Sequence, residues 1–311
     1  MTRFASRTLL LTSVLLLFCA PARTQTRTVY LYDELGRLKA VLTPSGEAAI
    51  YNYDAAGNIS SITRQLSTVL SILDFTPHKG TAGSSVTIYG TGFSSTPAQN
   101  IVLINGVAAS VTAASATQLI VTVPASATSG HIAVTTAGGT ALSTGYFFVP
   151  PSPFAAASVD FAARIELGET KPLGVNTANR IALIVFDGTA GQRVALQATN
   201  SVISSSTIRV IKPDGTSLFD PTSLSGNWFV DTLTLPVTGT YTIVIEPDAT
   251  FIGTMNLTLH DVPADVAGTT AGVPALTAPL HRGTTRPSPS QTLRVSASFG
   301  PTRRHADPTV W

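Results

Sequence analysis

The chain has 311 residues, which is enough for two or three domains, and 12% of its residues are charged while 44% are hydrophobic. This composition excludes a disordered, highly charged chain. The formal net charge is +2, and it falls to zero when Arg3 and Arg7 of the N-terminal segment are set aside. A chain without excess positive charge lacks the main source of affinity for nucleic acid, so we expect no nucleic-acid partner.

Residues 1–22 have the pattern of a cleaved secretory signal. Arg3 and Arg7 precede an apolar run that ends in an A-x-A site, Ala20-Pro21-Ala22. The run is too short to cross a bilayer of about 30 Å as a helix, so we expect cleavage after Ala22 and a secreted or cell-surface protein. Cys19 is the only cysteine, and lipidation there is the alternative, although large Phe18 precedes it. We expect no transmembrane segment after the signal is removed.

An internal repeat occupies residues 28–64, where the segment 30–38 recurs 21 residues later as 51–59. Each copy predicts a strand that ends in Tyr-x-Tyr, a tight turn at Asp-x-x-Gly and a second strand. The repeat resembles the YD repeat of RHS and wall-associated proteins, and the residues that carry the likeness are Tyr32-Asp33, Gly36-Arg37-Leu38, Tyr53-Asp54 and Gly57-Asn58-Ile59. Such families use dozens of repeats to wind a β-shell, sometimes around a toxin. Two repeats predict a terminal piece or remnant, without a chamber, in which most strand edges are unpaired.

Residues 71–149 contain short β-branched runs separated by clusters of Gly, Ser, Pro and Asn, which is typical of an antiparallel β-sandwich. The segment resembles an IPT/TIG domain, and the resemblance implies an immunoglobulin-like fold. Asn105-Gly106 predicts a two-residue hairpin turn with positive φ at both positions. The residues that carry the resemblance are Phe75-Thr76-Pro77, Gly80, Gly83, the run Val86–Phe93, Ile104-Asn105-Gly106-Val107, Val123-Pro124, Gly130 and Gly138-Gly139.

A Pro-rich linker at 150–155 leads to a second predicted sandwich at 156–262, whose strands alternate with turn signals. Its sequence resembles the bacterial pre-peptidase C-terminal domain, through Phe186–Val194, Pro213-Asp214-Gly215 and Gly239-Thr240-Tyr241-Thr242. The predicted fold class is therefore all-β: YD-repeat hairpins, then an immunoglobulin-like sandwich, then a jelly-roll-like sandwich.

The last residues, 263–311, hold five arginines against two aspartates and lose the strand pattern. We expect a disordered tail or the truncated start of another repeat, and a basic tail that binds polyanions is the alternative.

Catalytic and metal-binding patterns are not found in the sequence. No two of the five histidines lie within four residues of each other, and no G-x-S-x-G elbow occurs. Gly90-Thr91-Gly92 lacks the remaining features of a dinucleotide-binding loop and is expected at a bulge or corner of the sandwich. Turn residues are the expected role of four aspartates that precede glycines, namely Asp33, Asp54, Asp187 and Asp214. We therefore expect no enzyme activity, cofactor or metal.

Aromatic residues are the candidate ligand contacts. Tyr30 and Tyr32 alternate along one predicted strand, as Tyr51 and Tyr53 do along another, so each pair shares a face that can stack on sugar rings or pack on the next repeat. Trp228 and Phe229 follow Ser225-Gly226-Asn227 and either mark a binding loop or enter the core.

These features favour a secreted, non-enzymatic modular protein that acts as a spacer, an adhesin or a glycan- or protein-binding array. One alternative is an accessory fragment of a secreted peptidase or other hydrolase whose catalytic domain lies elsewhere. Another is a remnant of an RHS-type toxin delivery protein. The expected partner is an extracellular polysaccharide or a surface protein, and exposed strand edges predict a monomer or weak self-association.

Overall fold

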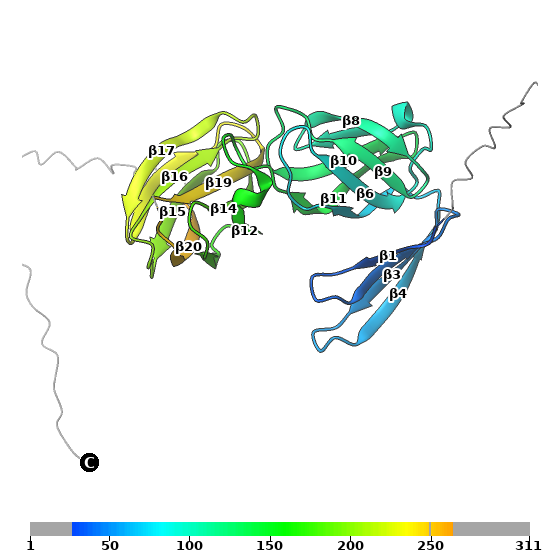
Figure 1. The fold of residues 1–311 in the computed structure, drawn as a ribbon, viewed down its shortest axis with the longest axis horizontal. Coiled ribbons are helices and arrows are strands. Elements are labelled where there is room, and N and C mark those ends of the chain that lie inside the picture. The colour runs from blue at the N-terminus through cyan, green and yellow to red at the C-terminus, as the bar shows by residue number, and fades with distance from the viewer. Residues whose placement is uncertain (1–26, 249, 264–311) are drawn as a thin grey trace, which may run out of the picture. The chain divides into compact units, whose positions relative to one another are not determined.

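The computed structural model of the chain describes residues 27–248 and 250–263, and this part is all-β (Figure 1), which confirms the predicted fold class. Within it, the only helical elements are two 3-10 turns, η1 (Pro97–Gln99) and η2 (Ala156–Ser158). No helix in these residues has the length and hydropathy needed to span a bilayer. The predicted signal segment 1–22 and tail residues 264–311 lie outside the described residues.

The two YD repeats form one antiparallel sheet in which each strand pairs with the next along the chain. Its strands are β1 (Val29–Tyr32), β2 (Leu38–Leu42), β3 (Ala48–Tyr53) and β4 (Ile59–Gln65). β1 and β3 both end at the second tyrosine of a Tyr-x-Tyr pair, as predicted. The expectation that most strand edges are unpaired is wrong, because β2 and β3 are paired on both sides.

Aspartate side chains build the turns between these strands, as the sequence predicted. The Asp33 carboxylate accepts hydrogen bonds from the backbone N–H groups of Leu35 (3.0 Å) and Arg37 (2.8 Å). Asp54 makes the equivalent contacts in the second repeat. Since these contacts span at most four residues, the turn is determined locally.

One face of this sheet packs on the IPT/TIG-like segment. Leu31 and Leu42 are buried on that face, where Leu73 and Tyr89 of the following domain contact them. The alternation of a strand then directs Tyr30 and Tyr32 away from this small core.

Residues 71–149 form seven strands in the order β11-β10-β7-β8-β9-β6-β5. The strands are β5 (Ser71–Thr76), β6 (Ser85–Thr91), β7 (Ile101–Ile104), β8 (Val107–Ala114), β9 (Gln118–Thr122), β10 (Gly130–Thr136) and β11 (Gly139–Phe147). β8 pairs with β7 at one end and with β9 at the other, so the sheet folds over one core. Phe75 and Ile88 from one half meet Ile104 and Val134 from the other in that core, which makes a sandwich.

Two local predictions in this sandwich agree with the structure. Asn105 (φ 44°) and Gly106 (φ 82°) both occupy the left-handed region and connect β7 to β8 in a two-residue turn. Gly90 faces a bulge in β5, and a Cβ added there would collide with the carbonyl oxygen of Ser71. The glycine therefore permits close backbone approach, which is the structural role expected for Gly90-Thr91-Gly92.

The second sandwich has a five-stranded sheet, β12-β14-β19-β16-β17, and a four-stranded sheet, β13-β20-β15-β18. The strands are β12 (Val159–Arg164), β13 (Thr170–Val175), β14 (Ile181–Gly188), β15 (Arg193–Thr199), β16 (Ser205–Ile211), β17 (Ser217–Ser225), β18 (Trp228–Thr234), β19 (Gly239–Pro247) and β20 (Gly253–Asp261). Both sheets contribute to one large apolar core, in which Phe186 and Tyr241 stack with their ring centres 5.3 Å apart.

A separate apolar cluster joins the two sandwiches. Phe148, which follows β11, and Phe154 of the Pro-rich segment pack against Val159, Leu183 and Val244 of the second sandwich. The Pro-rich segment therefore contributes a side chain to a buried contact in addition to connecting the domains. This cluster brings the polar side chains of both sandwiches close together.

Candidate ligand-binding groove and polar junction

Tyr30 and Tyr32 lie on the outer face of the four-stranded sheet and expose 56% and 58% of their surface, while Leu31 between them is buried. Tyr30 pairs with Val41, and Val41 pairs with Ala49. Direct cross-strand partners share a face of the sheet, and so do residues two apart along a strand. Ala49 therefore lies on the same face as Tyr30, and so do Tyr51 and Tyr53, which follow it in β3. All four predicted tyrosines therefore share one face.

Tyr53 has a packing role. Its hydroxyl donates a hydrogen bond to the Leu38 carbonyl oxygen (2.8 Å), and the guanidinium of Arg37 lies 4.4 Å from its ring centre. Arg37 and Leu38 belong to the first repeat and Tyr53 to the second, so this ring fastens the repeats together. Tyr51 is half-buried and borders neither of the two grooves described below.

Tyr30 and Tyr32 line a groove of about 840 Å³, which we call the tyrosine groove. Tyr89 of β6 also lines it, and the far wall includes Ser95 and the segment 114–118 that leads into β9. Among the described residues, Arg27 is the only charged one in this lining. The sequence pattern identified the first two tyrosines, but Tyr89 is far away along the chain and gave no comparable signal.

Several polar groups of the tyrosine groove lack a protein partner. Within the described residues, the hydroxyls of Tyr30, Tyr32 and Tyr89 and the side-chain amide of Gln118 make no hydrogen bond. The hydroxyls of Tyr53, Tyr146 and Tyr241, by contrast, all bond to the protein. The groove thus offers flat apolar rings together with free donors and acceptors, which is the combination that orients a polar ligand.

A second groove, of about 610 Å³, also has Tyr32 in its lining, and we call it the charged groove. The turn after β1, the strand β5 and the end of β11 contribute to it, as do β12 and β13 of the second sandwich. Its titratable side chains, as far as the structure describes the chain, are three acidic residues, three Lys or Arg residues and one histidine: Asp33, Glu34, Asp74, Lys39, Arg164, Lys171 and His78.

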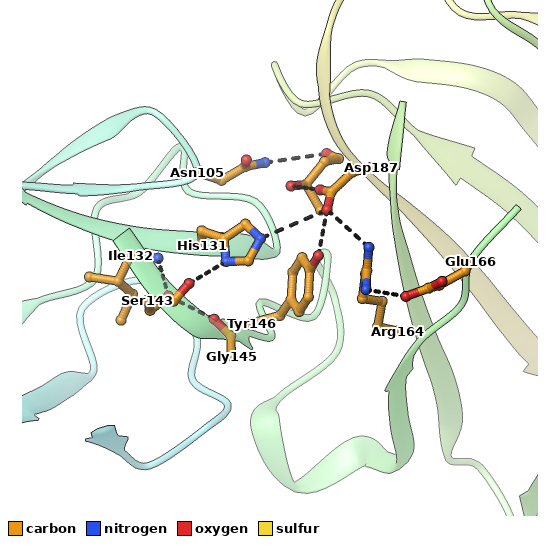
Figure 2. Close-up of polar contacts among 10 residues, drawn as sticks. Asn105, His131, Ile132, Ser143, Gly145, Tyr146, Arg164, Glu166 and Asp187 are labelled. Carbon is orange, nitrogen blue, oxygen red and sulfur yellow. Dashed lines mark hydrogen bonds and ion pairs between the residues drawn. The ribbon is translucent and has the colours of Figure 1, made fainter. Parts of the chain in front are cut away.

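Asp187 is the centre of a polar cluster between the two sandwiches (Figure 2). Its carboxylate accepts hydrogen bonds from the hydroxyls of Tyr146 and Thr240 (2.7 Å for Thr240). His131 Nε2 and an Arg164 guanidinium nitrogen each lie 3.8 Å from the same carboxylate. The sequence interpretation of Asp187 as a turn residue is wrong, because it lies within β14 and pairs with Thr240.

The cluster shifts the pKa values of its members. His131, and then the Tyr146 and Thr240 hydroxyls, hold the pKa of Asp187 well below its usual range, although partial burial acts in the opposite direction. Burial and the hydrogen bond to Asp187 raise the pKa of Tyr146. The carboxylate is therefore ionised and the phenol protonated at neutral pH, which is the state in which the hydrogen bond between them forms.

The geometry of His131 favours a positioning role for the cluster. Its Nδ1 lies 2.8 Å from the carbonyl oxygen of Ser143, which can only accept, so Nδ1 carries a proton. Nε2 faces the Asp187 carboxylate, and among the described residues no hydroxyl or thiol hydrogen-bonds to this ring. A histidine–carboxylate pair without an adjacent nucleophile lacks the arrangement of nucleophilic catalysis. The described residues also contain no group of three or more metal-ligating side chains.

The remaining two predicted contacts separate into core and surface. Trp228 is 7% exposed within the large core of the second sandwich, and its buried Nε1 has no hydrogen-bond partner, so its assignment as a ligand contact is wrong. Phe229 is 56% exposed, with its ring centre 6.4 Å from that of His260, and it borders neither groove. Both lie in β18, so the predicted binding loop is a strand.

Two protein-family models match the chain. Residues 70–149 match the IPT/TIG domain, and residues 32–65 match the RHS repeat. These matches confirm the two resemblances that the sequence carried. A comparison with curated protein sequences found no match.

Solved structures give partial similarities. An auxiliary nutrient binding protein from Bacteroides thetaiotaomicron is 20% identical, with a TM-score of 0.26, over 39% of this chain and 24% of its own. The pre-peptidase C-terminal domain of a Bacillus anthracis collagenase is 13% identical, with a TM-score of 0.24, over 32% of this chain and 93% of its own.

A third structure aligns with a larger part of the chain. The SGBP-B protein of the Bacteroides ovatus mixed-linkage glucan utilization locus, solved with a heptasaccharide, is 10% identical, with a TM-score of 0.22, over 67% of this chain and 80% of its own. Similarities at these scores assign no function to the chain. The aligned part also spans only about a quarter of the length of the nutrient binding protein.

Proposed function

We propose that this chain is a secreted or cell-surface modular binding protein without catalytic activity, and that the tyrosine groove binds its glycan or protein ligand. Export is supported by the N-terminal pattern, in which Arg3 and Arg7 precede an apolar run and an A-x-A site. An exported chain with a formally uncharged mature sequence meets extracellular polysaccharides and surface proteins, and not nucleic acid.

One observation carries the choice of surface. Tyr30 and Tyr32 keep more than half of their surface exposed, have unpaired hydroxyls and border a groove together with Tyr89. Where tyrosines serve packing in this chain, their hydroxyls bond to the protein, as those of Tyr53 and Tyr241 do. Aromatic rings are enriched where one protein surface recognises another molecule.

The absence of catalytic activity is supported by the chemistry of the cluster that most resembles an active site. The oxygens of Asp187 already accept hydrogen bonds from Tyr146 and Thr240, and this carboxylate connects two domains. These hydrogen bonds serve to hold the two sandwiches together, so we assign ligand binding to the grooves and not to this cluster.

A glycan and extracellular-matrix protein array, probed with the full chain, tests the proposal. We expect specific binding that falls at least tenfold in the Tyr30→Ala/Tyr32→Ala double variant. Phe229→Ala is the matched control, because that ring has the same exposure as Tyr30 but lies outside both grooves. Binding that persists in the double variant, or falls equally in the control, would contradict the assignment of the groove. No binding by a folded sample would indicate a spacer.

A further inference from the structure

We infer that the tyrosine groove and the charged groove form one continuous cleft that holds a linear, uncharged polysaccharide across several sugar units. This inference rests on the proposed function and names the class of ligand. Tyr32 carries the connection, since within the described part of the chain it is the one residue that lines both grooves.

The two grooves follow each other along the chain at β1. The tyrosine groove is lined by Arg27, Thr28, Val29, Tyr30 and Tyr32, and the charged groove takes up the lining at Tyr32 and continues through the next two residues of the turn. A strand rises about 3.3 Å per residue, so a ligand that lies along β1 passes from one groove into the other at Tyr32.

The sizes of the grooves favour a polymer. At about 840 Å³ and 610 Å³, each groove alone falls within the roughly 300–1,000 Å³ that encloses one small molecule. Two such volumes that share a wall residue exceed what a single sugar or disaccharide can fill. A chain of repeating units fills both and gains contacts with each unit that is added.

The charges of the lining favour a neutral ligand. Counted over residues 27–248 and 250–263, the charged groove has as many acidic residues as Lys and Arg residues, and the tyrosine groove adds only Arg27. The cations of the charged groove are already paired: Lys39 Nζ lies 3.5 Å from Asp74, Lys171 Nζ lies 2.8 Å from Glu169, and Arg164 contacts two acidic residues. A polyanion would have to break these pairs.

The same side chains are well suited to hydroxyl groups. Carboxylates accept and ammonium or guanidinium groups donate charge-assisted hydrogen bonds, and a sugar hydroxyl can serve either as donor or as acceptor. Glu34 makes no hydrogen bond or ion pair among the described residues, so its carboxylate is free to accept from a ligand. The exposed rings of Tyr30 and Tyr32 supply flat apolar surfaces for the C–H faces of sugar rings.

Isothermal titration calorimetry of the full chain, with neutral oligosaccharides of two and six units, tests the cleft. The probes are cello-, xylo- and manno-oligosaccharides, with an oligogalacturonate hexamer as the anionic comparison. We expect at least one neutral hexamer to bind tenfold or more tightly than its dimer, and more tightly than oligogalacturonate.

Variants assign the two halves of the cleft. Tyr30→Ala should weaken dimer and hexamer by a similar factor, because both occupy the tyrosine groove. Glu34→Ala should reduce the affinity for the hexamer relative to the dimer and leave the affinity for the dimer unchanged. Tyr32→Ala should remove most of the affinity for both. Phe229→Ala should change neither, and circular dichroism of each variant checks that it is folded.

The outcomes separate this inference from the proposed function. Equal affinity for dimer and hexamer, or tighter binding of oligogalacturonate, overturns the cleft while the tyrosine groove still stands as a binding surface. Failure of all neutral hexamers to bind overturns the polysaccharide assignment. If the array then shows a protein ligand that needs Tyr30 and Tyr32, the proposed function survives, and if it shows none, both fall.

Discussion

The hydroxyl of Tyr146 on β11 donates a hydrogen bond to the carboxylate of Asp187 on β14, and this contact joins two sandwiches that are separate in sequence. Other polar contacts surround the same junction: Thr128 Oγ1 donates to the Pro213 carbonyl oxygen (2.8 Å), and Lys79 Nζ donates to that of Val159 (2.6 Å). Together with the apolar cluster around Phe148, they dock the sandwiches on each other. Asp187 is the shared acceptor in this junction.

Replacing this acceptor should weaken the chain. Asp187→Asn keeps the shape of the side chain but removes the charge that Tyr146, Thr240, His131 and Arg164 surround. Hydrogen bonds to charged groups contribute about 1.5–3 kcal/mol, and partial exposure reduces this, so we expect a loss of about 1–2 kcal/mol in the free energy of unfolding. Urea denaturation of the full chain measures it. Asp220→Asn is the control, because among the described residues the Asp220 carboxylate makes no hydrogen bond or ion pair, and an equal effect of both changes would contradict the role of Asp187.

The effect of Asp187 should also depend on pH. A carboxyl group whose pKa is lowered by folding stabilises the native state above its unfolded pKa of about 3.9, and this stabilisation is lost as the pH falls towards the folded pKa. The difference in unfolding free energy between the wild type and Asp187→Asn should therefore be constant near neutral pH and shrink below about pH 4. Denaturation series at several pH values measure this difference. The contributions of other aspartates with lowered pKa values are the same in both proteins and therefore cancel. A difference that stays constant down to pH 2 would refute the assignment.

The neighbouring aromatic residues of β18 should respond in opposite ways. Trp228→Ala leaves a large cavity in the main core and should lower the free energy of unfolding by about 3–5 kcal/mol. Phe229→Ala removes an exposed ring and should change it by less than about 1 kcal/mol. Chemical denaturation distinguishes the two. Similar losses in both variants would show that the assignment of one ring to the core and the other to the surface is wrong.

The hairpin turn between β7 and β8 should be sensitive to an added methyl group. A Cβ at Gly106 would meet open space, but its φ of 82° is unfavourable for any L-residue, so Gly106→Ala should cost about 1–2 kcal/mol. Gly138→Ala is the control, because Gly138 is not in the left-handed region and its Cβ would make ordinary contact at 3.5 Å. Thermal unfolding compares them. If the two variants have equal midpoints, backbone strain does not account for the glycine at 106.

The features predicted correctly from sequence are those set by short-range chemistry. The turn at Asp33 depends on hydrogen bonds within four residues, and the turn at Asn105-Gly106 depends on two φ angles. The shared face of Tyr30 and Tyr32 follows from the period of two in a strand. Each of these can be read from a short stretch of sequence because the causative atoms lie in that stretch.

Sequence reasoning failed, or left alternatives open, where the partners of a residue lie far away along the chain. Asp187-Gly188 has the composition of a turn, but strand pairing with Thr240 and hydrogen bonding to Tyr146 keep Asp187 in β14. For Trp228 the sequence left a binding loop and the core both open, and both sheets of the second sandwich enclose it in the core. In both cases the contacts that determine the residue's environment lie far away along the chain, and local composition does not report them.

By itself, the sequence determined the all-β class, the IPT/TIG and RHS-repeat segments and the shared face of each tyrosine pair, because strand period, turn chemistry and apolar patterning act between near neighbours. Only the tertiary structure decided that Tyr89 and Gln118 complete a groove with Tyr30 and Tyr32, and that Asp187 joins the two sandwiches. A groove and a domain junction depend on which surfaces pack together, and that packing is settled by the burial of apolar side chains over the whole chain.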